Sequence, residues 1–266
     1  MKTLPVCSLL VLAGVLCPIS TATAQSTETT QLLLDTRARI TEGWHRLDRT
    51  ILAEAAATAS RTASDRANAA FAHYYAGLAL YHQVSLVRDD EPTQLRLINE
   101  AITHLEAATN QRRNFADALA LLSTALGRKV MLHTASAFTQ GPRIGQLMSR
   151  ARRLEPSNPR VAYLEAVALY SRPKLLGGDK ARGLEGLQRA AVLFEQEIAT
   201  GIREALLPSW GREDVQAWIG LAHLEAGRLS EADAAFQRAL ELAPSFGWVQ
   251  RVLMPRLAAA RAQSNS

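Results

Sequence analysis

The chain has 266 residues, of which 30 are basic and 25 acidic, so its formal net charge is only +5. An excess this small does not indicate nucleic acid as a partner. Both cysteines, Cys7 and Cys17, lie near the N-terminus, which leaves the rest of the chain without disulfide bonds or thiol chemistry.

The first 24 residues have the pattern of an export signal. A positive residue, Lys2, precedes a mostly apolar run over residues 6–19, and residues 22–24 read Ala-Thr-Ala, which fits the small-x-small rule for cleavage. The apolar run is too short to span a bilayer, since spanning takes about 20 apolar residues. We therefore expect a signal peptide that is cleaved after Ala24, and a periplasmic or secreted protein without membrane insertion.

The remainder is expected to be a disordered lead over residues 25–30 and a single helical domain over residues 31–266. Apolar residues recur at helical spacing through most of this domain. The predicted helices come in pairs: residues 71–83 with 99–108, about 115–133 with 144–156, and 158–170 with 180–198.

The stretch "RPKLLGGDKARG", residues 172–183, raises the question of a phosphate site because two glycines stand among basic residues. A phosphate loop of the Walker type needs a Gly-Lys pair followed by Ser or Thr, and here Gly178 is followed by Asp179, whose carboxylate would repel phosphate. The stretch instead predicts a turn between two helices. Pro173 ends the first helix, Gly177 and Gly178 let the backbone reverse, and Asp179 caps the second.

The strongest pattern is "EDVQAWIGLAHLEAGRLSEADAAFQRALELAP", residues 213–244. Gly227 is predicted to end its first helix, Ser230 to cap its second and Pro244 to stop that helix. The stretch resembles a tetratricopeptide repeat, in which small and large residues alternate where two helices cross closely. It departs from the consensus at the fourth position of the repeat, where Gln216 stands, and Trp218 occurs two residues after that position. The consensus positions that are filled in register are Gly220, Gly227, Ala232, Phe236, Ala239 and Pro244.

The same offsets recur more loosely upstream, with Gly77 in one first helix and Ala101, Leu105 and Ala108 in the helix that follows. The 172–183 turn is also similar to one in exported bacterial tetratricopeptide proteins. The resemblance implies an all-α fold, an α-α superhelix of about four to five helix pairs. A final helix over residues 246–263, bent at Pro255, is expected to cap this solenoid.

No arrangement of residues indicates an enzyme. The six histidines show no i, i+4 pair of the kind that binds zinc on a helix, and no serine lies in a Gly-x-Ser-x-Gly motif. The acidic run at residues 89–91 and the arginines near residue 150 are typical of solvated surface. We therefore expect no catalytic residues, no cofactor, no metal site and no nucleic-acid partner.

Three functions remain compatible with the sequence. The first is a periplasmic adaptor or scaffold that binds a peptide or protein in the concave groove of the solenoid. The second is a carrier for a small organic anion, similar to the tetratricopeptide partners of solute transporters. The third is a structural module of an envelope complex.

A recurring spacing suggests where a partner would bind. Tyr74 and Tyr81 are seven residues apart in one first helix, and Tyr163 and Tyr170 are seven apart in another, so each pair shares a face. In the tetratricopeptide register these positions are implied to line the concave surface. The alternative is that the tyrosines pack between helices with their hydroxyls satisfied. The candidate binding residues are Tyr74, Tyr81, His82, Arg160, Tyr163 and Tyr170.

Overall fold

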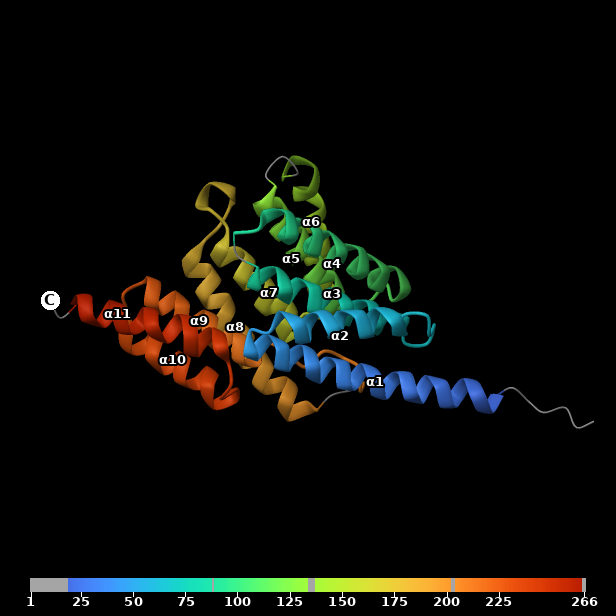
Figure 1. Cartoon of the computed structure of the whole chain (residues 1–266). Helices are drawn as coiled ribbons and strands as arrows, with labels where there is room; N and C mark the ends of the chain where they lie inside the picture. The colour runs from blue at the N-terminus through green and yellow to red at the C-terminus, as the bar shows by residue number, and fades with distance from the viewer. Residues whose placement is uncertain (1–18, 88, 134–136, 202–203, 265–266) are drawn as a thin grey trace, which may run out of the picture.

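A computed structural model describes residues 19–87, 89–133, 137–201 and 204–264 (Figure 1). These residues form eleven α-helices, a short 3-10 turn and one π-helical segment, and they contain no strand. Successive helices pack against their neighbours along the chain, which confirms the predicted all-α superhelical solenoid.

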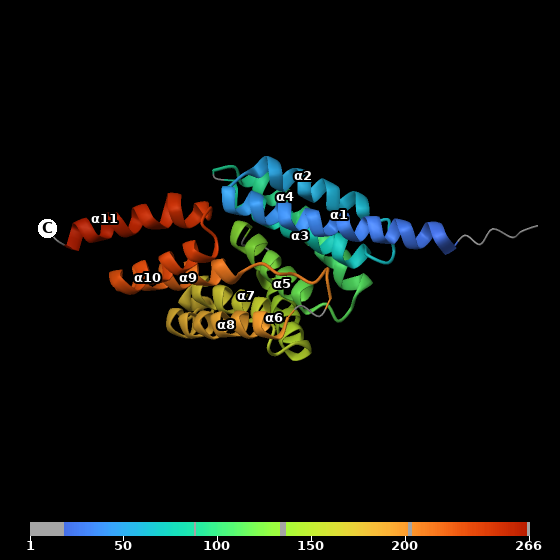
Figure 2. The same cartoon turned by 90° about the horizontal axis from the view of Figure 1, so that it is seen from below.

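The helices form five hairpins, and each hairpin packs against the next (Figure 2). A π-helical segment, η3 (Val249–Leu253), and a final helix, α11 (Met254–Ser264), follow the last hairpin. The hairpins are α1 (Ile19–Arg46) with α2 (Arg49–Thr62), α3 (Ala69–Leu86) with α4 (Glu91–Gln111), α5 (Ala116–Leu132) with α6 (Ala137–Leu154), α7 (Pro159–Ser171) with α8 (Lys180–Thr200), and α9 (Arg212–Glu225) with α10 (Leu229–Leu242).

The N-terminal region differs in part from the prediction. Residues 25–30, expected to be a disordered lead, lie within α1. Most of the expected signal peptide, residues 1–18, lies outside the described residues. None of the described helices is long and apolar enough to cross a membrane.

Close approach between paired helices explains why small residues occur at particular positions. A Cβ atom added at Gly77 of α3 would lie 2.7 Å from Cγ of Leu105 in α4, and one added at Gly220 of α9 would overlap the ring of Phe236 in α10. Leu105 and Phe236 are completely buried. A large side chain therefore fits into the space that a missing Cβ leaves on the facing helix.

The turn at residues 172–179 reverses the chain as predicted. Gly177 has a φ of 83°, in the left-handed region, and a Cβ at Gly178 would overlap the carbonyl oxygen of Arg172. The carboxylate of Asp179 accepts a hydrogen bond of 3.0 Å from the backbone N–H of Arg182 and so caps α8. The predicted cap at Ser230 is wrong, because α10 begins at Leu229 and already includes Ser230, and its N-cap residue, Arg228, makes no side-chain capping bond.

The C-terminal segment returns to the start of the domain. Arg251 donates a hydrogen bond of 2.6 Å to the carbonyl oxygen of Arg46 at the end of α1, and a Cβ at Gly247 would lie 2.8 Å from the carbonyl oxygen of His45. The helix expected over residues 246–263 contains a π-helical segment just before Pro255, in which the N–H of Met254 reaches the carbonyl oxygen of Val249. The segment that follows the last hairpin is thus in contact with the end of α1.

The connection between α8 and α9 runs across the first helices of two earlier hairpins. Arg37 of α1 donates hydrogen bonds to the carbonyl oxygens of Ala205 and Leu207, at 2.8 and 2.9 Å. Tyr75 of α3 donates one of 2.8 Å to the carbonyl oxygen of Leu206. This connection, residues 204–211, is therefore anchored to α1 and α3 although it has no regular structure.

Candidate functional site

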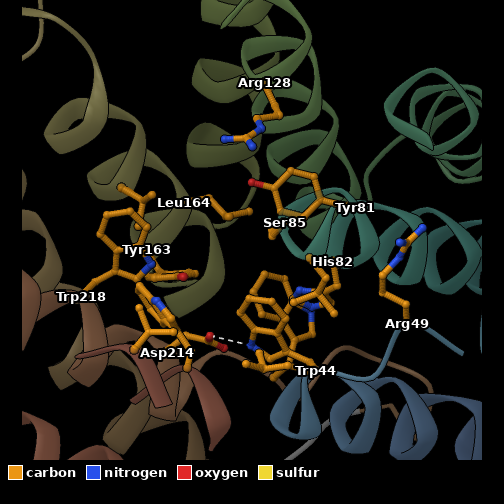
Figure 3. Close-up of a pocket in the computed structure, with 16 residues that line it drawn as sticks. Trp44, Arg49, Tyr81, His82, Ser85, Arg128, Tyr163, Leu164, Asp214 and Trp218 are labelled. Carbon is orange, nitrogen blue, oxygen red and sulfur yellow. Dashed lines mark hydrogen bonds between the residues drawn. The ribbon is translucent and has the colours of Figure 1, made fainter. Parts of the chain in front are cut away.

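A pocket of about 400 Å³ lies where the first helices of the five hairpins converge (Figure 3). Every one of α1, α3, α5, α7 and α9 contributes a side chain to it, and η3 adds Val252. All the tryptophans in the chain line this one pocket: Trp44, Trp210, Trp218 and Trp248. Tryptophan supplies a large flat apolar surface with a single hydrogen-bond donor, so the lining is suited to stacking.

Two contacts fix one wall of the pocket. The indole N–H of Trp44 donates a hydrogen bond of 2.9 Å to Oδ1 of Asp214 in α9. The same indole stacks on the imidazole of His82 in α3, with ring centroids 4.5 Å apart and an angle of 23° between the planes. Trp44, near the end of α1, therefore joins the first hairpin to the second and to the fifth.

His82 is neutral at physiological pH. Its side chain is buried, and burial lowers its pKa to about 3, with the positive charge of His45 acting in the same direction. The ring thus adds a flat, uncharged face to the pocket.

Asp214 is the acidic group of the lining. Asp214 is only 2% exposed, and burial raises the pKa of its carboxyl to about 7. The nearby charge of Glu213 also raises this pKa. The hydrogen bond from Trp44 and the charge of His45 oppose this shift. His45 is itself hydrogen-bonded to Glu213 at 2.8 Å. Burial lowers the pKa of His45, but the bond to Glu213 and the charge of that residue outweigh burial and raise it.

Basic side chains lie on the side of the pocket opposite Asp214. Figure 3 shows the guanidinium of Arg128, from α5, and the hydroxyl of Tyr81, from α3, pointing toward one another. Burial raises the pKa of Tyr81, and the charge of Arg128 opposes that rise. Arg49, at the start of α2, is exposed and adds a second positive charge to the lining.

The structure brings three of the six sequence-predicted binding residues to this pocket, namely Tyr81, His82 and Tyr163. Tyr74 lies beneath the α8–α9 connection, completely buried, and its hydroxyl accepts a hydrogen bond of 2.8 Å from the indole N–H of Trp210. Tyr170 is 5% exposed and donates a hydrogen bond of 2.7 Å to Glu225. For Tyr74 and Tyr170 the geometry matches the alternative, packing between helices with a satisfied hydroxyl.

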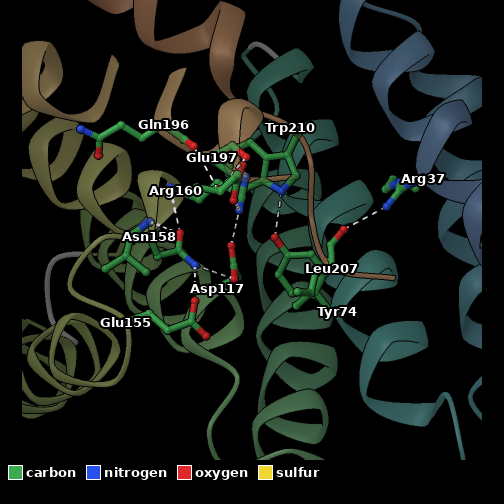
Figure 4. Close-up of polar contacts among 12 residues, drawn as sticks. Arg37, Tyr74, Asp117, Glu155, Asn158, Arg160, Gln196, Glu197, Leu207 and Trp210 are labelled. Carbon is green, nitrogen blue, oxygen red and sulfur yellow. Dashed lines mark hydrogen bonds and ion pairs between the residues drawn. The ribbon is translucent and has the colours of Figure 1, made fainter. Parts of the chain in front are cut away.

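Arg160 was expected to offer a cationic donor to a partner, but its charge is already neutralised within the protein (Figure 4). Its Nε lies 2.6 Å from Oδ1 of Asp117, and its two terminal nitrogens bind the carboxylate of Glu197. Arg160 is only 3% exposed, and Asn158 donates a further bond of 2.9 Å to Asp117. Arg160 thus links α5, α7 and α8 within the core.

Several pocket residues were not singled out from the sequence. Asp214 and Trp218 are four residues apart within α9, so they share one face of that helix, and this spacing could have been noticed. Trp210 precedes α9 in the irregular connection, so helical spacing does not place it. Trp44 and Arg128 carried no such signal, because their relation to α9 depends on how the hairpins are stacked.

The described residues include no group of three or more His, Cys, Asp or Glu side chains that could hold a metal ion. His73 and His104, from α3 and α4, do meet, with 3.0 Å between their Nδ1 atoms. No protein-family model matches the chain, and no curated protein matches it.

Proposed function

We propose that this protein acts by binding, and that it holds a small, flat organic molecule in the aromatic pocket. The observation that carries the proposal is the convergence of all the tryptophans on one pocket of about 400 Å³. Ligand sites are typically concave, mostly apolar and supplied with a few polar groups that orient the ligand. Here Asp214, Arg128 and Tyr81 are such groups.

A small molecule is favoured over an extended peptide because the chain occupies much of its own inner surface. Tyr74 and Tyr75, on the first helix of the second hairpin, are covered by Trp210 and Leu206 of the α8–α9 connection. Tyr163 of the fourth hairpin also contacts Trp210, with 6.1 Å between ring centroids. An extended segment would have to displace a connection that is anchored by several hydrogen bonds.

The proposal includes a family and a location. Tetratricopeptide-type repeats are supported by the close approaches at Gly77 and Gly220 and by complete burial of Ala232 and Ala239. Export to the periplasm is supported by the pattern of residues 1–24. Mass spectrometry of the secreted protein should find a chain that starts at Gln25, and a retained Met1 would contradict export.

Native mass spectrometry of the purified protein tests the binding role. We expect a retained small molecule, and we expect Val167→Phe to abolish its retention because Val167 lines the pocket and the larger ring fills it. Val192→Phe is the matched control, since Val192 is 56% exposed on α8, outside the pocket. The proposal fails if flat aromatic compounds neither copurify with the protein nor change its tryptophan fluorescence on addition.

A protein or peptide adaptor is the second candidate, and one surface feature favours it. Leu175 and Leu176, in the turn between α7 and α8, are 95% and 64% exposed, which is unusual for adjacent leucines. Crosslinking in the periplasm followed by pull-down should then capture a partner with the wild-type chain and lose it with Leu175→Asp and Leu176→Asp together. Equal capture by both chains would remove this candidate.

A further inference from the structure

Two residues that line the pocket each have a buried polar atom without a hydrogen-bond partner. The atoms are Oδ2 of Asp214 and Nε of Arg128, and neither has a partner within the part of the chain that the structure describes. More than nine in ten buried polar groups in proteins are hydrogen-bonded, so two unpaired atoms on residues that line one pocket require an explanation. The explanation that fits both atoms is a ligand that supplies the missing partners.

The other polar groups around Asp214 are already engaged. Its Oδ1 accepts from Trp44, and its neighbour Glu213 is paired with His45. His82 is neutral, and neither of its ring nitrogens is hydrogen-bonded to Oδ2 of Asp214. The free Oδ2 therefore needs a donor that no described side chain provides.

The two unpaired groups stand on different sides of the pocket. Figure 3 shows Arg128 on the α5 side of the pocket and Asp214 on the α9 side. Arg128 is positively charged, so its expected partner is an anion. A carboxylate suits a guanidinium because its two oxygens match the planar fork of N–H groups. Asp214 calls for an N–H or O–H donor.

We propose that the ligand is a planar aromatic carboxylate that carries an amino or hydroxyl group at the end opposite its carboxylate. The carboxylate binds Arg128, the aromatic body stacks among the tryptophans, and the amino or hydroxyl group donates a hydrogen bond to Oδ2 of Asp214. This inference rests on the proposed function, since it names the class of molecule that the same pocket holds.

Isothermal titration calorimetry with three naphthalene probes tests each contact separately. The first probe carries a carboxylate and a hydroxyl on opposite rings, the second only the carboxylate, and the third only the hydroxyl. We expect the first to bind most tightly, and each of the others to bind on the order of tenfold more weakly.

Variants assign the two ends. Arg128→Met should lower the affinity of both carboxylate probes about tenfold and leave the affinity of naphthol unchanged. Lys129→Met is the control, because it removes a positive charge from the adjacent position, outside the pocket, and it should change no affinity. Asp214→Leu, which has a similar size and no polar atom, should reduce the affinity of the hydroxynaphthoate to that of naphthoate and leave naphthoate unchanged. Thermal melts confirm that each variant is folded.

The outcomes separate this inference from the function on which it rests. If all three probes bind equally and neither variant discriminates among them, the pocket binds flat molecules but the assignment of Arg128 and Asp214 is overturned. If no probe binds the wild-type protein and no small molecule is retained through purification, the proposed function fails, and the ligand class fails with it.

Discussion

The indole N–H of Trp210 donates a hydrogen bond of 2.8 Å to the hydroxyl of Tyr74, although the two residues are 136 positions apart. Tyr74 is completely buried and Trp210 is 9% exposed. The bond holds the irregular α8–α9 connection against α3, so this connection is part of the core and also forms one wall of the pocket.

Tyr74→Phe should lower the free energy of unfolding by about 1 to 3 kcal/mol, because it leaves the buried N–H of Trp210 without an acceptor. Urea denaturation followed by circular dichroism measures the change. Tyr81→Phe is the control, since the hydroxyl of Tyr81 faces the pocket, and its effect should stay within about 0.5 kcal/mol. Equal losses in the two variants would contradict the assigned role of the Trp210–Tyr74 bond.

Arg160→Met should lower the free energy of unfolding by about 3 to 5 kcal/mol. It removes the cation that pairs with Asp117, whose carboxylate is buried and only 2% exposed. Arg152→Met removes an arginine whose ion pair with Glu165 is exposed, and it should cost less than about 1 kcal/mol. Both are read from the same denaturation experiment. A small effect at Arg160 would mean that Asp117 finds another partner or remains accessible to water.

Asp214→Asn should stabilise the protein in a pH-dependent way. The pKa of Asp214 is about 7 in the folded protein, whereas an unperturbed aspartate has a pKa of 3.8. Between these pH values the folded state therefore binds more protons than the unfolded state. Stability that depends on the protonated carboxyl is complete below about pH 4 and is lost as pH rises toward 7. The free energy of unfolding of the variant, relative to wild type, should therefore increase over this range by as much as about 4 kcal/mol.

The variant removes the titration of Asp214 itself and also the contribution that its charge makes to the raised pKa of His45. Denaturation series at several pH values provide the measurement. A difference that does not vary with pH would show that the carboxyl of Asp214 titrates normally in the folded protein.

Ala239→Leu should destabilise by about 1 to 3 kcal/mol, because Ala239 is completely buried where α10 packs against α9. Ala258→Leu, on the exposed side of α11, is the matched control and should have little effect. An unchanged melting temperature for Ala239→Leu would show that the helix crossing is looser than the geometry indicates.

The fold was predictable where local spacing determined the packing. Gly220 and Phe236 were assigned to positions where the two helices of a repeat cross closely, and the structure brings them together. They lie in adjacent helices joined by a short turn, so the sequence separation is small and the close crossing follows from helical periodicity. Gly77 and Leu105 were assigned to the same kind of crossing, and they also meet.

The candidate site was less predictable because it depends on the stacking of hairpins that are far apart in the sequence. The prediction for Arg160 treated it as free, but its partners Asp117 and Glu197 are 43 and 37 residues away. Likewise, the repeat register predicts that Tyr74 lies on the inner surface, but it does not predict that the α8–α9 connection covers Tyr74. Spacing identifies a helix face, but it does not identify what lies against that face.

Contact between the C-terminal segment and the end of α1 limits how such a protein can evolve and fold. An open solenoid can gain or lose a repeat with little effect on the others, because each repeat contacts only its neighbours. Here Arg251 is bonded to Arg46 across 205 positions, so a sixth hairpin would separate the two ends and open the pocket. Contacts of long sequence separation such as this one are expected to slow folding relative to an open array of the same helices.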